Sequence, residues 1–169
     1  MEKITFSEMS FPLKCKFLLA TVGGVGLLPK APGTFGSFVA MSILFVPFEI
    51  RVYILPVLVI ICSIIFMVVI PEIDSIFSHD ASLIVLDELI GMWVLYSFFF
   101  IPVSIYWYII GFGLFRLFDI WKPFPINLIN NQKTVFSILA DDIVAAIFAT
   151  VTVYLFYNTS LVLPFLLYL

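Results

Sequence analysis

The sequence predicts an all-α integral membrane protein, a helical bundle of short and hairpin transmembrane helices with Pro/Gly-rich polar loops gathered on the cytoplasmic face. Composition supports this, because 63% of the residues are hydrophobic and 11% are charged, at a mean hydropathy of +1.22. Soluble domains carry roughly a quarter charged residues. Long apolar runs also alternate with short polar segments rich in proline and glycine. The 169 residues are expected to form one domain, with an N-terminal surface segment (1–16), a core (17–158) and an apolar tail (159–169).

A helical hairpin is expected over residues 34–70. Two prolines and two glycines argue against a continuous helix in the preceding stretch, Leu28–Ser37. The run Val52–Ile70 is long enough for a bilayer core of about 30 Å. Glu49–Arg51 is interpreted as the solvated polar tip of this hairpin, and Pro71 is expected to end it.

Residues 89–115 form two apolar arms about Pro102. Each arm is short for a complete span, so the segment is either one kinked helix or a hairpin. We favour the hairpin, because it returns Arg116 and Asp119 to the side of the chain that holds Asp87.

The last part of the chain is expected to hold a polar loop and one span. The loop covers Asn127–Lys133, and the final helix is predicted to start near Asp141 and to cross the bilayer by Tyr157. The tail Leu161–Leu169 is apolar and contains Pro164, so it is expected to lie in the bilayer or to re-enter it.

The distribution of basic residues gives an orientation. Arg51 falls on one side of this arrangement, and the lysines fall on the other, which the positive-inside rule makes cytoplasmic. Membrane lipids are therefore expected partners, whereas the lack of a basic patch excludes nucleic acid. The sequence does not fix the oligomeric state. The lysines in question are Lys3, Lys14, Lys16, Lys30, Lys122 and Lys133.

Charged side chains gather in four islands at the ends of the apolar runs. A charge beside the bilayer core costs several kcal/mol unless it has a partner, a cavity or a function. Acids outnumber bases in the islands, which indicates a shared polar site that attracts a divalent cation. The islands are Lys30 beside Pro32-Gly33-Thr34; Asp80, Asp87 and Glu88; Arg116, Asp119 and Lys122; and Asp141-Asp142.

Each island also has a purely structural interpretation. Asp87-Glu88 and Asp141-Asp142 could cap helices, whose N-termini favour acids. Arg116, Asp119 and Lys122 are spaced three residues apart, so they could form an ion-pair ladder on one helix. A lone His79 beside Asp80 is more often a surface or capping residue than a catalyst. The acids fall at three separate helix ends, all expected on the same side of the membrane. A purely structural role for all of them together is therefore less probable than for any one island alone.

The alternative is phosphate chemistry. Arg suits bidentate phosphate contact and Lys supplies a point charge, and Gly33 and Gly36 let backbone approach an anion beside Thr34 and Ser37. Cysteine phosphatases need an Arg six positions after the Cys, where this chain has Thr21 and Val68. Phosphohistidine chemistry needs two His, and no Asp-x-Asp motif is present. Metal-assisted hydrolysis, with carboxylates holding Mg²⁺, remains.

Four segments together resemble the bacterial phosphatidylglycerophosphatase A family. The resemblance runs in matching order from about Leu18 to Phe148, with one departure, a glycine-free loop at Asn130–Val135. The segments are Leu28–Ser37, Asp87–Trp93, Phe115–Pro125 and Asp141–Ala145.

The resemblance implies an inner-membrane, multi-pass, Mg²⁺-dependent phosphatase of phospholipid biosynthesis, which converts phosphatidylglycerophosphate to phosphatidylglycerol with its site facing the cytoplasm. A small ion or proton-coupled transporter is the alternative, with the acids as a relay, and a structural membrane subunit is a third possibility. The candidate catalytic and metal ligands are Asp87, Glu88, Asp119, Asp141 and Asp142, one of which could be the general base. Lys30, Thr34, Ser37, Arg116 and Lys122 are candidate phosphate ligands, and Asp80 and His79 are second-tier candidates.

Overall fold

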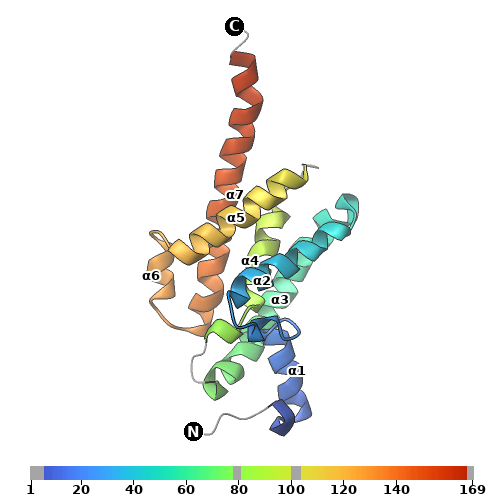
Figure 1. Cartoon of the computed structure of the whole chain (residues 1–169), viewed down its shortest axis with the longest axis vertical. Helices are drawn as coiled ribbons and strands as arrows, with labels where there is room; N and C mark the ends of the chain where they lie inside the picture. The colour runs from blue at the N-terminus through green and yellow to red at the C-terminus, as the bar shows by residue number, and fades with distance from the viewer. Residues whose placement is uncertain (1–5, 78–80, 100–103, 167–169) are drawn as a thin grey trace.

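The computed structural model describes residues 6–77, 81–99 and 104–166, and within these ranges every regular element is helical (Figure 1). The all-α prediction is therefore confirmed. The α-helices are α1 (Phe11–Ala20), α2 (Pro32–Ala40), α3 (Phe48–Ile76), α4 (Leu86–Ser97), α5 (Ile105–Trp121), α6 (Ile126–Asn130) and α7 (Val135–Leu166). Short 3₁₀ turns form η1 (Phe6–Glu8), η2 (Val25–Leu27), η3 (Met41–Phe45) and η4 (Ala81–Leu83).

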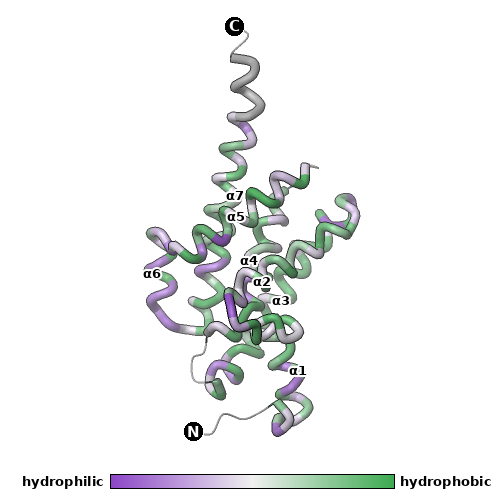
Figure 2. Tube along the Cα trace, viewed as in Figure 1, coloured by the Kyte–Doolittle hydropathy of each residue, from purple (hydrophilic) through white to green (hydrophobic). Residues whose placement is uncertain are grey.

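Two helices are long and apolar enough to cross a membrane. They are α3 and the Val135–Thr159 part of α7. Figure 2 shows that α3 is hydrophobic over most of its length, whereas hydrophilic residues gather around α6 and at the start of α2. The second half of α7 extends beyond the other helices (Figure 1).

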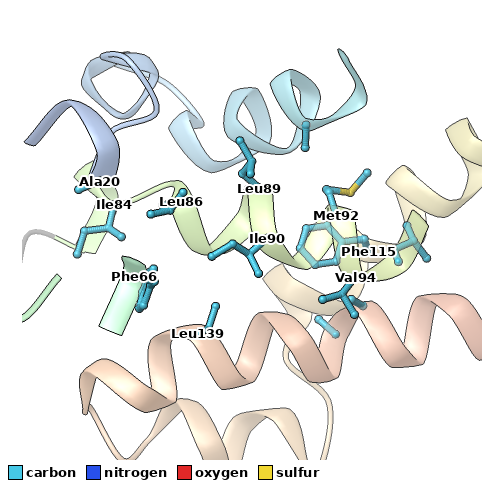
Figure 3. Close-up of a cluster of buried hydrophobic side chains, with 14 of the residues drawn as sticks. Ala20, Phe66, Ile84, Leu86, Leu89, Ile90, Met92, Val94, Phe115 and Leu139 are labelled. Carbon is cyan, nitrogen blue, oxygen red and sulfur yellow. The ribbon is translucent and has the colours of Figure 1, made fainter. Parts of the chain in front are cut away.

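Helix α4 forms the centre of the bundle. Its hydrophobic residues are buried on all sides, as expected for a helix enclosed by others. Figure 3 shows Leu89 pointing toward α2 and Ile90 toward α7, with Phe66 of α3 and Phe115 of α5 close by. Ile90, Phe66 and Phe115 are fully buried. This enclosure brings the first turn of α4, which carries two acids, into contact with several helices.

The predicted hairpin over residues 34–70 is present, with α2 and η3 as one arm and α3 as the other. No continuous helix runs through Leu28–Ser37, as expected, because η2 ends at Leu27 and α2 begins only at Pro32. Pro32 takes the first helical position, where its missing N–H would have had no intrahelical partner. Gly36 is needed for packing, because a Cβ there would lie 2.9 Å from Cβ of Val85.

Two expectations about α3 are wrong. Pro71 does not end the helix, which continues to Ile76 because its last turns pack inward, with Ile73 only 1% exposed. Arg51 is not a solvated tip but is 7% exposed, and its Nη2 donates a hydrogen bond to Tyr108 Oη at 2.6 Å. The guanidinium also stacks over the Tyr108 ring at 5.0 Å.

The N-terminal segment is more than a surface element. Met9 is 5% exposed, and Phe17 of α1 packs against Phe77 with ring centroids 5.2 Å apart. Lys16 forms an ion pair with Glu72 of α3. These contacts attach α1 to the end of α3.

Residues 89–115 form the hairpin rather than one kinked helix. The two arms pack closely, since a Cβ on Gly111 of α5 would lie 3.1 Å from Cδ2 of Leu95 of α4. The return of α5 brings Arg116 Nη1 to 3.9 Å from Glu88 Oε1. The bend at Pro102 lies outside the described residues.

Helix α7 starts at Val135, earlier than the predicted start near Asp141. Thr134 and Ser137 satisfy its first turn reciprocally, because each backbone N–H donates to the other's hydroxyl oxygen, at 2.9 and 3.0 Å. Asp141 and Asp142 are therefore inside the helix, which removes the capping explanation for them.

One C-terminal expectation also needs correction, because the short helix α6 covers the first part of the loop predicted at Asn127–Lys133. Helix α7 continues through Pro164 to Leu166. A proline's fixed φ is compatible with helix, but inside a helix it removes one backbone hydrogen bond and its ring crowds the carbonyl four residues earlier.

A small residue at position 91 is required for the three helices to meet. A Cβ on Gly91 would lie 2.8 Å from two ring atoms of Phe115 and 3.3 Å from Cβ of Asp142. Because Phe115 is fully buried, we expect Gly91→Ala to lower the free energy of unfolding by about 1–3 kcal/mol. Thermal unfolding in detergent checks this.

Gly113→Ala is the matched control. It lies on α5 with no heavy atom within 4 Å of the new Cβ, so Ala there is expected to stabilise the helix by about 0.5–1 kcal/mol. Equal effects of the two substitutions would contradict the packing account.

Candidate active site

Three carboxylates meet at the centre of the bundle. Asp87 and Glu88 come from the first turn of α4, and Asp142 comes from about two turns inside α7. One oxygen from each residue lies within 4.8 Å of the others. Asp87 is 7% exposed and Asp142 is 3% exposed, whereas the Glu88 side chain is 15% exposed, so two members of the carboxylate trio are buried and the third is partly open to solvent.

Two bases from the end of α5 border the trio. Arg116 Nη1 lies 2.6 Å from Asp119 Oδ2, and Lys122 Nζ lies 3.7 Å from Asp119 Oδ1. The predicted intrahelical ladder is therefore present. It is not self-contained, because Arg116 also faces Glu88 and Lys122 pairs with Asp141 of α7.

Lys122 stays positively charged at this position. Burial alone works against its charge, but the hydrogen bond and charge of Asp141, assisted by Asp119 and Asp142, outweigh burial and raise the pKa of the Lys122 ammonium. Nζ also donates to Asn130 Oδ1 at 3.1 Å. A fixed positive charge thus faces the same space as the acids.

The start of α2 closes the site from another side. A Cβ on Gly33 would lie 2.0 Å from Glu88 Oε1 and 3.3 Å from Arg116 Nη2, so glycine permits this approach. Ser37 Oγ donates to the Gly33 carbonyl at 2.9 Å and accepts from Arg116 Nη1 at 3.4 Å. The N-terminus of a helix favours an anion here.

Several polar atoms of the site are buried without a partner. Among the described residues, these atoms are Asp87 Oδ1, Glu88 Oε2, Asp142 Oδ2 and Arg116 Nε. A buried acceptor without a donor costs about 1–3 kcal/mol, and more when it is charged. Each member of the trio thus has an oxygen with no protein partner, as expected of residues that bind a cation.

Charge balance points the same way. Five acids share the site with two bases, a formal excess of three negative charges before any protonation: Asp87, Glu88, Asp119, Asp141 and Asp142 against Arg116 and Lys122. Buried charge is costly unless it is compensated. Carboxylate oxygens are the ligands that Mg²⁺ prefers, so the trio fits this ion.

The structure separates the candidate residues into groups. The trio comes together as described, while Asp119 and Asp141 are engaged by the two bases. Among described residues, no recorded hydrogen bond or ion pair joins Lys30 or the Thr34 side chain to the acids; Lys30 is exposed and Thr34 half-buried. The second-tier candidates His79 and Asp80 lie outside the described residues.

Two contributors were not found from sequence. Asn130 falls in the segment predicted as a polar loop, yet its side-chain oxygen accepts a hydrogen bond from Lys122 Nζ. Gly91 matters because Phe115 of α5 and Asp142 of α7 pack against it. A single sequence does not indicate that a glycine three residues after an acid pair is needed for packing.

The sequence matches the profile of the phosphatidylglycerophosphatase A family over residues 18–157. It is similar to phosphatidylglycerophosphatase A of Escherichia coli, with 36% identity over 81% of this chain and 80% of that protein. The corresponding Haemophilus influenzae protein is 33% identical over 81% and 85%.

A further relative has a different name. A Bacteroides thetaiotaomicron protein, provisionally named phosphatidylinositol-3-phosphatase, is 29% identical over 86% of this chain and 95% of its own length. No solved structure matches the chain. From the family profile and the two phosphatidylglycerophosphatase A relatives, the chain belongs to the phosphatidylglycerophosphatase A family, a family of phosphatases.

Proposed function

We propose that this protein is a Mg²⁺-dependent lipid phosphatase that hydrolyses phosphatidylglycerophosphate to phosphatidylglycerol and inorganic phosphate in phospholipid biosynthesis. The observation that carries the proposal is the carboxylate trio with Arg116 and Lys122 beside it. The names of the Escherichia coli and Haemophilus influenzae relatives support the substrate.

The trio Asp87, Glu88 and Asp142 would hold Mg²⁺, with Asp119 and Asp141 as neighbours. When bound, this ion supplies charge neutralisation at the phosphoryl oxygens and a more acidic water. Arg116, whose Nε has no partner, donates to the substrate phosphate, and Lys122 adds a fixed positive charge. One carboxylate of the site accepts the proton of the attacking water.

The protein is proposed to lie in the bacterial inner membrane as a multi-pass protein, with the site facing the cytoplasm. Two helices of sufficient length and hydropathy support insertion. Lysines near the candidate site support the orientation through the positive-inside rule, since Lys30 precedes α2 and Lys122 follows α5 as its C-cap.

The transporter alternative is not favoured. A relay needs acids distributed at depth along the spans. Here the described acids of the site gather where α4 begins, α5 ends and α7 completes its second turn, and they are joined there by two bases.

Phosphate release by the purified protein tests the proposal. With phosphatidylglycerophosphate in mixed micelles, we expect release that EDTA removes and added Mg²⁺ restores, because the trio is expected to lose its cation to the chelator. No release with Mg²⁺ present, or release indifferent to EDTA, would contradict the proposal.

Phosphatidylinositol 3-phosphate is the second substrate to compare, because of the name of the Bacteroides relative. Both lipids carry a phosphate monoester, which the site could bind through Arg116. We expect a higher kcat/KM with phosphatidylglycerophosphate. The opposite ranking would transfer the assignment to the inositol lipid.

A further inference from the structure

An apolar groove lies along the second half of α2, η3 and the start of α5. It occupies about 550 Å³, within the range of roughly 300–1,000 Å³ typical of ligand pockets. Ser42 contributes one hydroxyl, and the other lining side chains are apolar. They include Phe38, Val39, Met41, Phe45 and Ile105.

The groove and the site are formed by two of the same helices, α2 and α5. On α2, Ser37 contacts Arg116, and the next residue, Phe38, already lines the groove. On α5, Ile105 lines the groove and Arg116 reaches the site, with about 16 Å of helix between them. Helices α2 and α5 would therefore contact the phosphate near Ser37 and Arg116, and farther along they form the apolar walls of the groove.

A hydrogen bond from α4 holds the junction between α2 and η3. Trp93 of α4 donates its Nε1 hydrogen to the Ala40 carbonyl at 3.1 Å. Ala40 itself is fully buried, so this bond satisfies a carbonyl at the end of α2. The groove wall is thus held in place by the same central helix that carries Asp87 and Glu88.

We propose that this groove holds one acyl chain of the lipid whose phosphate binds at the site. The inference rests on the proposed function, because it assumes a substrate with a phosphate monoester joined to fatty chains. A chain in the groove gains little from hydrophobic transfer, since in the bilayer it only leaves other chains. Its contribution is to orient the headgroup toward Arg116 and the trio.

Filling the groove from either wall tests this. Ser42→Trp and Ile105→Trp place an indole in the groove from two elements, at positions that are exposed. The measurement is phosphate release from diacyl phosphatidylglycerophosphate in mixed micelles and from its deacylated, water-soluble headgroup. We expect release from the diacyl lipid to fall about 10- to 100-fold in both variants. Release from the headgroup should stay near the wild-type rate.

Ile60→Trp is the matched control. Ile60 is 61% exposed on α3 and does not line the groove, so its variant should act on both substrates as wild type does. Unchanged diacyl hydrolysis in Ser42→Trp and Ile105→Trp overturns the groove proposal and leaves the proposed function intact. A wild-type protein inactive on the diacyl lipid overturns both.

Discussion

Asp142→Asn is expected to lower phosphate release by at least about 100-fold while leaving the fold as stable as before, or more stable. The activity falls because a ligand of the trio becomes neutral, and even residues that only support a metal ligand cost about 10- to 100-fold when replaced. Stability does not fall, because the change removes one of three formally excess negative charges from a buried site. Phosphate release and thermal unfolding, measured on the same preparation, check both parts.

Glu49→Gln is the control, since Glu49 is an exposed acid in the first turn of α3. Activity should not change there, and stability should fall by at most about 1 kcal/mol, the contribution of an exposed acid at a helix N-terminus. If Asp142→Asn destabilised the protein and left activity intact, the acids would be structural, as expected of a subunit without enzymatic function.

Arg116→Ala is expected to remove both activity and stability. The guanidinium is the partner of Asp119 at 2.6 Å, faces Glu88, and donates to Ser37 of α2. Removing one partner of a buried ion pair costs about 3–5 kcal/mol, because the other charge remains. Activity should fall by at least about 10- to 100-fold, as charged hydrogen bonds to the phosphate contribute about 1.5–3 kcal/mol.

A double variant separates the two losses. Adding Asp119→Asn to Arg116→Ala removes the stranded charge, so stability should partly return while activity stays low. Lys133→Asn is the control for loss of a positive charge, since Lys133 is exposed and Asn tolerates its φ of 51°. Recovery of activity in the double variant would show that Arg116 does not hold the phosphate.

The membrane-type composition and the order of apolar runs were enough to predict the helical class and both hairpins. Predictions from single residues, such as a proline as a helix end or an arginine as a solvated charge, failed where tertiary packing decides the outcome. Pro71 looks like a helix breaker, yet the packing of Ile73 carries α3 past it. Arg51 resembles a loop charge, yet it is buried, in part against Tyr108, which is distant in sequence.

The acids of the site could be identified from sequence because charge is rare in such a chain. Their grouping could not, because it depends on how α4, α5 and α7 pack around Gly91 and Phe115. Sequence spacing paired Arg116 with Asp119 correctly. It gave no reason to separate Asp141, which pairs with Lys122, from Asp142, which joins the trio.

Metal binding by the trio is the central claim, and a Mn²⁺ titration followed by electron paramagnetic resonance tests it most directly. Mn²⁺ takes the oxygen ligands that Mg²⁺ prefers, and its spectrum reports bound and free ion without any need for activity. Wild type and Glu49→Gln should show saturable binding at one site, and Asp142→Asn should lose it. Absence of saturable binding in wild type, or equal binding by Asp142→Asn, would contradict a cation site at Asp87, Glu88 and Asp142.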